Sequence, residues 1–279
     1  QCVGNTPLIH LEKLSRECGA HLHIKLEMRN PGGSIKDRVA LHLIRCALCD
    51  GTLKPGSTVL EATSGNMGIG IALAARAMGL KAVLTMPETM SVERRKLIAG
   101  FGAEVVLTPG AKGMKGSLDT AYELAKERGG MVLGQFTNLR AREAHYISTG
   151  PEIYRQLDGQ ADVLVAGVGS GSSLSGTGRF LKERIKGFRI VAVEPSASPV
   201  ISGGKATYDS RTGTDSKYAK IDNTKVDGKY TIQLGEDLYD GDLVKADGAD
   251  DDFGRPSVKW TFENKEVGTY ADDADTVYT

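Results

Sequence analysis

Lys36 occupies an unusual position for a lysine, in the predicted first turn of a helix. In residues 30–38 a proline and two glycines precede Ser34, a good N-cap, and an apolar helical run follows. The positive end of the helix dipole lowers the pKa of an amine there and favours its neutral form. A neutral lysine amine can form a Schiff base with a carbonyl compound. The alternative is an ordinary solvated lysine at a helix start.

Two turns of small residues follow apolar strands and open into predicted helices. The strand at residues 59–62 leads into the turn 63–68, and the strand at 163–166 leads into the Gly/Ser-rich loop 169–176, with helices expected at 71–78 and 178–186. Backbone N–H groups in such turns bind phosphate or carboxylate. Neither turn has Walker or dinucleotide-binding spacing, so the alternative is a plain strand-to-helix connection. A nucleophilic lysine with two anion-binding turns favours pyridoxal phosphate, a phosphorylated aldehyde.

In these features the chain closely resembles the cysteine synthase (O-acetylserine sulfhydrylase) family of fold type II pyridoxal-phosphate enzymes. The resemblance covers about residues 1–204, whereas residues 205–279 match no family pattern that we recognise. It is carried by specific motifs at residues 4–8, 30–38, 64–66, 87–95, 112–116, 135–138 and 149–152, and by the loop that starts at Gly169.

The resemblance implies a role for each matching residue. Lys36 would carry the cofactor as a Schiff base and then act as the catalytic base, and Asn66 would hydrogen-bond the cofactor's ring hydroxyl. The cofactor phosphate would be held by Gly169, Ser170, Gly171, Ser172 and Ser173. The substrate carboxylate would be held by Thr63, Ser64, Gly65, Met67 and Gln135.

The activity implied by the resemblance is β-replacement, which forms L-cysteine from O-acetyl-L-serine and sulfide, in a homodimer. A cystathionine β-synthase-like or a serine dehydratase-like lyase would use the same parts, so both are alternatives. A third alternative is a catalytically dead, cysteine synthase-like binding module. It arises because the family's glycine-rich active-site loop and its later serine, which contacts the pyridine nitrogen, are not found after Gly204.

Two further departures lie inside the matching region. Met67 stands where the family usually has threonine, so a hydroxyl is lost while the backbone N–H is kept. Ser172 and Ser173 stand where the family has Gly-Thr. If the loop needs a positive φ at Ser172, its side chain costs on the order of 1 kcal/mol.

Charge and residue types divide the chain near Lys205. Residues 205–279 hold 17 acidic and 10 basic residues, a net charge of −7, whereas the preceding residues hold 18 and 25, a net of +7. All Cys, Met and His precede this boundary, and the only Trp follows it. Residues 229–234 and 257–262 alternate polar and apolar side chains, which is typical of antiparallel strands. We expect a small β module or a partly disordered acidic tail.

Alternating strand-like and helix-like segments between residues 22 and 193 predict an α/β fold with two lobes built on parallel sheets. No apolar run reaches the ~18 residues of a membrane span, no secretory leader is visible, and no long basic run suggests nucleic acid. We therefore expect a soluble, cytoplasmic protein whose partners are small molecules.

The four cysteines are too few and too unevenly spaced for a disulfide framework. His42, Cys46 and Cys49 share one predicted helix, but a second pair with ligand spacing is missing, so we interpret these cysteines as core residues and expect no metal site. His145 has no nucleophile in a recognised turn nearby in the sequence, and we interpret it as structural.

Overall fold

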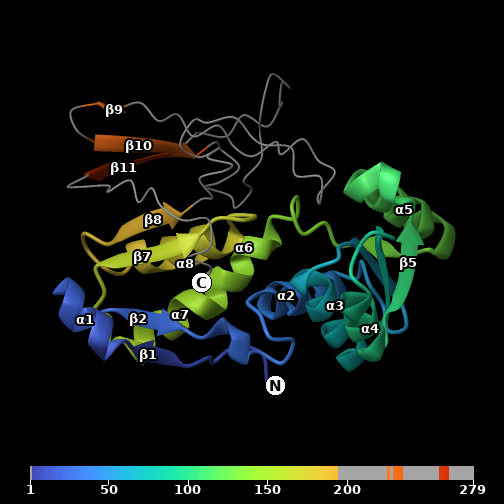
Figure 1. The fold of residues 1–279 in the computed structure, drawn as a ribbon, viewed down its shortest axis with the longest axis horizontal. Coiled ribbons are helices and arrows are strands. Elements are labelled where there is room, and N and C mark those ends of the chain that lie inside the picture. The colour runs from blue at the N-terminus through green and yellow to red at the C-terminus, as the bar shows by residue number, and fades with distance from the viewer. Residues whose placement is uncertain (1, 194–224, 227–228, 235–257, 264–279) are drawn as a thin grey trace.

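The computed structural model describes residues 2–193, 225–226, 229–234 and 258–263, and these contain two parallel sheets with helices packed against them (Figure 1). This arrangement confirms the expected α/β class. The larger sheet has the strand order β5-β4-β3-β6, and all its neighbours are parallel. Its strands are β3 (Thr58–Ala62), β4 (Lys81–Pro87), β5 (Glu104–Thr108) and β6 (Met131–Val132).

Successive side chains of each strand point to opposite faces of this sheet, and different helices cover the two faces. Val59 and Leu84 belong to the main hydrophobic cluster, which also includes residues of α2 and α3, whereas Leu60 and Val83 pack with Ala125 of α5. Alternation with a period of two is what a strand covered on both faces requires. The helices of this unit are α2 (Lys36–Cys49), α3 (Asn66–Ala77), α4 (Val92–Gly100) and α5 (Gly113–Arg128), with the short turn η2 (Gly110–Lys112) before α5.

The second unit is built on a pair of parallel strands, β7 and β8. Its own small cluster of Ile153, Leu181 and Phe188 joins the helices to this sheet. Two lobes with separate parallel sheets are thus present, as the sequence predicted. The elements of this unit are α6 (Arg140–Ala144), the π-helical turn η3 (His145–Thr149), α7 (Gly150–Gln156), β7 (Val163–Gly167), α8 (Ser172–Lys182) and β8 (Arg189–Val193).

Helices α3 and α8 each begin earlier than the sequence suggested, at Asn66 and Ser172. Glycine has a low helix propensity, so the glycines of these two segments favour a loop in a prediction from sequence. Gly70 and Gly176 lie inside the helices, where each packs closely against a backbone carbonyl group. A Cβ at Gly70 would lie 3.2 Å from the carbonyl oxygen of Lys36, and one at Gly176 would collide with the carbonyl oxygen of Arg142.

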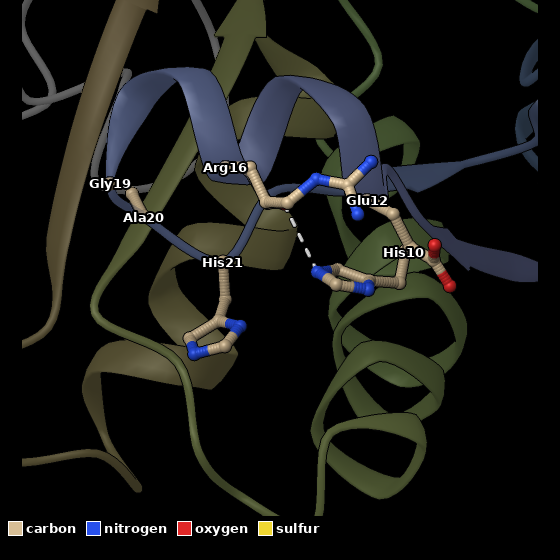
Figure 2. Close-up of a pocket in the computed structure, with 7 residues that line it drawn as sticks. His10, Glu12, Arg16, Gly19, Ala20 and His21 are labelled. Carbon is tan, nitrogen blue, oxygen red and sulfur yellow. Dashed lines mark hydrogen bonds between the residues drawn. The ribbon is translucent and has the colours of Figure 1, made fainter.

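The N-terminal segment forms an antiparallel pair, β1 (Leu8–His10) and β2 (His23–Lys25), connected through α1 (Glu12–Cys18) and followed by the turn η1 (Glu27–Arg29). Ser15 fixes this connection, because its hydroxyl contacts His10 Nε2 at 3.0 Å and accepts the backbone N–H of Leu22. The rings of His10 and His21 lie 5.7 Å apart beside a pocket that Arg16 also lines (Figure 2).

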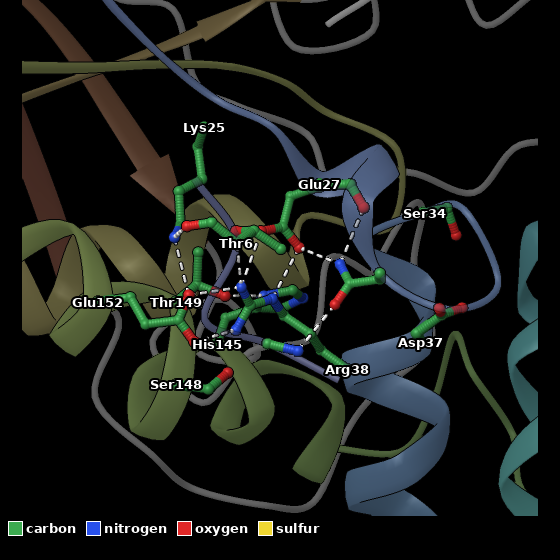
Figure 3. A network of polar contacts seen from close by, with 12 residues as sticks. Thr6, Lys25, Glu27, Ser34, Asp37, Arg38, His145, Ser148, Thr149 and Glu152 are labelled. Carbon is green, nitrogen blue, oxygen red and sulfur yellow. Dashed lines mark hydrogen bonds and ion pairs between the residues drawn. The ribbon is translucent and has the colours of Figure 1, made fainter. Parts of the chain in front are cut away.

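A buried ion-pair network connects this segment to both lobes (Figure 3). Arg38 of α2 bonds Glu27 at 2.7 Å and Glu152 of α7 at 2.7 Å, and its side chain is 2% exposed. Lys25 of β2 bonds Glu152 as well, at 2.8 Å. Burial alone would raise the pKa of Glu152, but the hydrogen bonds from Arg38 and Lys25 lower it to about 2. The network therefore stays ionised at neutral pH.

Beyond the two lobes, the structure describes three further strands that form an antiparallel sheet in the order β11-β10-β9. They are β9 (Lys225–Val226), β10 (Lys229–Leu234) and β11 (Val258–Glu263). The alternation at residues 229–234 and 257–262 therefore predicted both main strands correctly, to within one residue. The expected domain boundary at Lys205 lies outside the described residues. Among those described, no helix combines the length and apolar character needed to cross a membrane.

Replacing Arg38 with methionine should destabilise the fold strongly. Glu27 and Glu152 would keep their buried carboxylates without the cation that compensates them, and breaking a buried pair in this way costs about 3–5 kcal/mol of unfolding free energy. Urea unfolding of Arg38→Met beside Arg45→Met, an exposed arginine of the same helix, measures the difference. The control should stay within about 0.5 kcal/mol of wild type. Equal stability of the two variants would contradict a central role for the network.

Candidate active site

Lys36 is the first residue of α2, and its side chain points into the protein rather than into solvent. The N-cap position is Ile35 and not Ser34, so the helix starts one residue later than a Ser34 cap would give. Ser34 still contributes, because its hydroxyl accepts the backbone N–H of Lys36 at 3.2 Å. Burial lowers the pKa of the Lys36 amine. The expected neutral amine is therefore supported, with loss of solvation as its cause.

The turn before α2 is closed by Asp37. Its carboxylate accepts the backbone N–H of Gly32 at 2.5 Å, and a Cβ on Gly32 would collide with that same carboxylate. Glycine is thus required at Gly32 for the chain to fold back on the first turn of the helix. This local contact holds the start of α2, and so the backbone of Lys36, in place.

The Gly/Ser loop joins β7 to α8 at the N-terminus of that helix. Gly171 occupies the N-cap with φ 74°, a left-handed conformation, and no side chain caps the first turn. The positive φ falls on Gly171 and not on Ser172, which is already helical, so the strain considered for Ser172 does not arise. Ser170 and Ser172 lie 2.9 Å apart through their hydroxyl oxygens. Uncapped N–H groups beside hydroxyls form a site suited to an anion.

The loop and the lysine meet across 134 residues of sequence. Lys36 Nζ lies 3.5 Å from the Ser170 hydroxyl oxygen. This contact brings together the predicted nucleophile and the predicted phosphate loop, which come from different lobes. At the candidate site, this contact joins a residue of one lobe directly to a residue of the other.

The turn after β3 lies at the carboxyl end of the larger sheet and beside the start of α2. Thr63 is buried and its hydroxyl accepts the N–H of Gly65 at 3.3 Å, while Asn66 is exposed at the first position of α3. Met67 is 2% exposed and packs in the main hydrophobic cluster. Its side chain is therefore a core residue, and the group it offers to a ligand is its backbone N–H.

Gln135 follows β6 and is held by Glu61, a residue that the sequence reasoning missed. Glu61 lies in β3 and its carboxylate accepts the backbone N–H of Gln135 at 3.2 Å. Burial raises the pKa of Glu61 to about 7, although bonds from backbone N–H groups act in the opposite direction. The sequence did contain a signal for this residue, because Glu61 is the one acidic residue within the apolar run of residues 59–62.

Some of the predicted residues are not joined directly. Within the described part of the chain, no hydrogen bond connects Asn66 or the Gln135 side chain to Lys36. His145 is buried, and its Nδ1 lies 2.9 Å from the Thr149 hydroxyl oxygen. Burial, and then the charge of Lys36, lower the pKa of His145 to about 3. A neutral, bonded imidazole fits the structural role expected for it.

The cysteines of α2 differ from the expectation. Cys46 is half-buried and Cys49 is exposed, so their interpretation as core residues is wrong. The helix turns Cys49 outward because the buried face of α2 is already filled by Leu43, Ile44 and Ala47.

Comparisons with known proteins identify related enzymes. The pyridoxal-phosphate dependent enzyme family matches residues 1–250. A cysteine synthase of Staphylococcus aureus (strain Mu50) is 50% identical over 206 residues, 74% of this chain and 66% of that protein. A cysteine synthase of a Flavobacterium species is 42% identical over 239 residues, 85% of this chain and 78% of that protein.

Solved structures give the same result. An O-ureido-L-serine synthase is 40% identical with a TM-score of 0.69, over 72% of this chain and 64% of that one. A hydrogen sulfide-producing enzyme from Fusobacterium nucleatum is 41% identical with a TM-score of 0.68, over 73% and 68%. The chain belongs to the cysteine synthase family of pyridoxal-phosphate-dependent enzymes, whose fold is type II. It spans 66% of the length of the Staphylococcus relative.

Gly171→Asp should weaken binding of pyridoxal phosphate at least about tenfold, or ~1.4 kcal/mol, because a carboxylate at the helix N-cap would repel the phosphate. Gly129→Asp is a matched control: Gly129 also has a left-handed backbone, with φ 62°, but it lies at the C-cap of α5. Spectroscopic titration of cofactor into both variants measures the effect. Wild-type affinity in Gly171→Asp would mean that the loop is only a turn.

Glu61 should make stability fall as pH rises. Its pKa of about 7 in the folded protein lies above the ordinary value of 4.5, so the folded state keeps a proton that the unfolded chain releases. This stabilisation is complete below about pH 4.5 and is lost by about pH 7, a change of roughly 3 kcal/mol. The lowered pKa of His145 acts in the opposite direction over the same range, so the effect of Glu61 is measured as a difference in unfolding free energy between variant and wild type. This difference should change with pH for Glu61→Gln and stay constant for Glu123→Gln, an exposed control. An identical pH profile for Glu61→Gln would contradict the assignment.

Proposed function

We propose that the chain is a pyridoxal-phosphate-dependent enzyme in which Lys36 binds the cofactor and acts as the catalytic base. The observation that carries the proposal is the 3.5 Å contact between Lys36 Nζ and the Ser170 hydroxyl. It places an amine of lowered pKa beside the N-terminus of α8, and one ligand that has both an aldehyde and a phosphate needs these two features side by side.

The residues present fit this cofactor. The first turn of α8 offers backbone N–H groups, and Ser170, Ser172 and Ser173 offer hydroxyls, all of which suit a phosphate. Gly169 adds to the fit, since a Cβ built there would meet nothing within 4 Å, which leaves open space in the loop. Asn66 is exposed at the start of α3 and is available to the ring hydroxyl.

The turn after β3 is proposed to bind the substrate carboxylate. The first N–H groups of α3, at Asn66 and Met67, have no partner within the helix and are oriented for an anion. Thr63, Ser64 and Gly65 precede them, and Glu61 fixes the backbone of Gln135 alongside. The departure from threonine at Met67 then leaves the backbone donor intact and removes one hydroxyl.

The chemistry follows from these positions. When bound, pyridoxal phosphate supplies an electron-withdrawing system that stabilises the charge left on a substrate Cα. Lys36 Nζ, whose pKa is lowered by burial, would remove the substrate Cα proton and later return it. Between these events the leaving group departs from Cβ and a nucleophile adds at the same carbon. His145 does not compete for the proton, since burial keeps it neutral and bonded to Thr149.

The finer proposal is that O-acetyl-L-serine and sulfide are the substrates and L-cysteine is the product. Support comes from the two cysteine synthases that are 50% and 42% identical to the chain. Two solved structures, an O-ureido-L-serine synthase and a hydrogen sulfide-producing enzyme, suggest the alternative reactions against which this assignment has to be tested. The homodimer implied by the resemblance and the cytoplasmic location expected from the sequence stay predictions.

Lys36→Ala should abolish both the yellow cofactor absorbance and turnover, whereas Lys54→Ala, an exposed lysine, should change neither. Borohydride reduction of wild type followed by peptide mapping should find the cofactor on Lys36 Nζ. A label on another lysine would refute the assignment, and a colourless wild-type protein in excess cofactor would favour the binding module without activity.

The substrate assignment is tested on the coloured protein by comparing kcat/KM for three reactions. These are cysteine formation from O-acetyl-L-serine and sulfide, formation of O-ureido-L-serine, and release of sulfide from cysteine. The first should be the fastest. A larger kcat/KM for either of the others would replace the finer proposal and leave the role of Lys36 intact.

A further inference from the structure

A cluster of three potential metal ligands lies on α2 and α6, outside the groups that the proposed reaction uses. His42 Nε2 lies 3.4 Å from Cys46 Sγ and 3.3 Å from Glu143 Oε2. The ligand atoms of all three residues lie within 4.8 Å of one another. Imidazole, thiolate and carboxylate are the three side-chain types that bind Zn²⁺.

The distances match a tetrahedral ion. With Zn–N and Zn–O bonds of about 2.0 Å and a Zn–S bond of about 2.3 Å, tetrahedral angles place N and O about 3.3 Å apart and N and S about 3.5 Å apart. The observed separations from His42 are 3.3 Å and 3.4 Å. Glu143 is half-exposed, so its carboxylate can rotate to complete the third separation.

The backbone holds these ligands without help from an ion. His42 and Cys46 are four residues apart on α2, which puts them on one face of the helix. Glu143 is 101 residues after His42, and its neighbours Ala141 and Ala144 are buried in the same hydrophobic cluster as Leu43. Packing of α6 against α2 therefore fixes the third ligand relative to the other two.

The charges around the cluster allow a cation. The positive charge that acts on Cys46 is that of Arg140, whose guanidinium is paired with Asp50 at 2.5 Å. A zinc ion binds the thiolate form of cysteine, so binding at this cluster would release the Cys46 thiol proton. Cys49 lies one turn further on, outside the cluster.

We propose that His42, Cys46 and Glu143 form a zinc-binding site that connects α2 to α6, with the fourth position open to water. Three protein ligands and one open position are a common arrangement for this ion. The site needs no cofactor and no substrate, so it stands independently of the proposed function.

The test is titration of the full-length protein with Co²⁺ alone, which reports tetrahedral geometry and thiolate ligation in its absorption spectrum, followed by displacement with Zn²⁺. Wild type should give a saturable tetrahedral spectrum with a thiolate charge-transfer band. Cys46→Ala should lose that band and bind Co²⁺ at least about tenfold more weakly. Loss of a residue that only supports a ligand already weakens metal binding by about tenfold or more, and loss of a ligand should cost at least as much. Glu143→Gln should keep the band and also bind at least about tenfold more weakly.

Cys49→Ala is the matched control, because it removes a thiol from the same helix without touching the cluster. It should bind Co²⁺ as wild type does, and circular dichroism should show that all variants are folded. Zn²⁺ should also raise the Tm of wild type and of Cys49→Ala, but not of Cys46→Ala. The proposal is overturned if wild type shows no saturable tetrahedral spectrum, if Cys46→Ala binds like wild type, or if Cys49→Ala loses the band.

Discussion

The buried guanidinium of Arg38 is the interaction on which the arrangement of this chain depends. It bonds Glu27 before α2 and Glu152 in α7, and Glu152 in turn bonds Lys25 of β2. A buried charge has to be compensated by partners in well-defined positions, so this network fixes the N-terminal segment, α2 and α7 relative to one another. Lys36 lies two residues before Arg38 on the same helix, and the network therefore also fixes the candidate nucleophile.

Glycine gives the second constraint, because it sets how closely the helices approach. Gly70 lets α3 lie against the carbonyl oxygen of Lys36, and Gly176 lets α8 lie against the segment that carries His145. With a larger residue at Gly176 the backbone of α8 or of its neighbour would have to move, and at Gly70 a smaller adjustment would be needed. The glycines that resemble loop residues in the sequence thus have a packing role inside helices.

Burial then decides which groups near the site are charged. Arg38 is stabilised as a cation by its two carboxylates. Among the residues that the structure describes, no ion pair reaches Lys36, Glu61 or His145, and burial shifts the pKa of each toward its neutral form. A neutral lysine in a poorly solvated position is a better nucleophile and base than a solvated one. The three proposed zinc ligands differ from these groups, because two of them lie on the partly exposed face of α2 and the ligand atoms of all three lie close together.

The sequence by itself determined the class of fold, the strands on both sides of the Gly/Ser loop, the family, and Lys36 as the residue of interest. These follow from local patterns, namely hydrophobic period, turn residues and a helix start. Only the tertiary structure decided what meets across long separations: Lys36 with Ser170, Glu61 with Gln135, and His42 and Cys46 with Glu143. It also decided that Met67 faces the core, that the positive φ falls on Gly171, and that Cys49 is exposed. Each of these depends on which elements pack together, and a pattern read along the chain contains no information about the neighbour that a side chain or a glycine will meet.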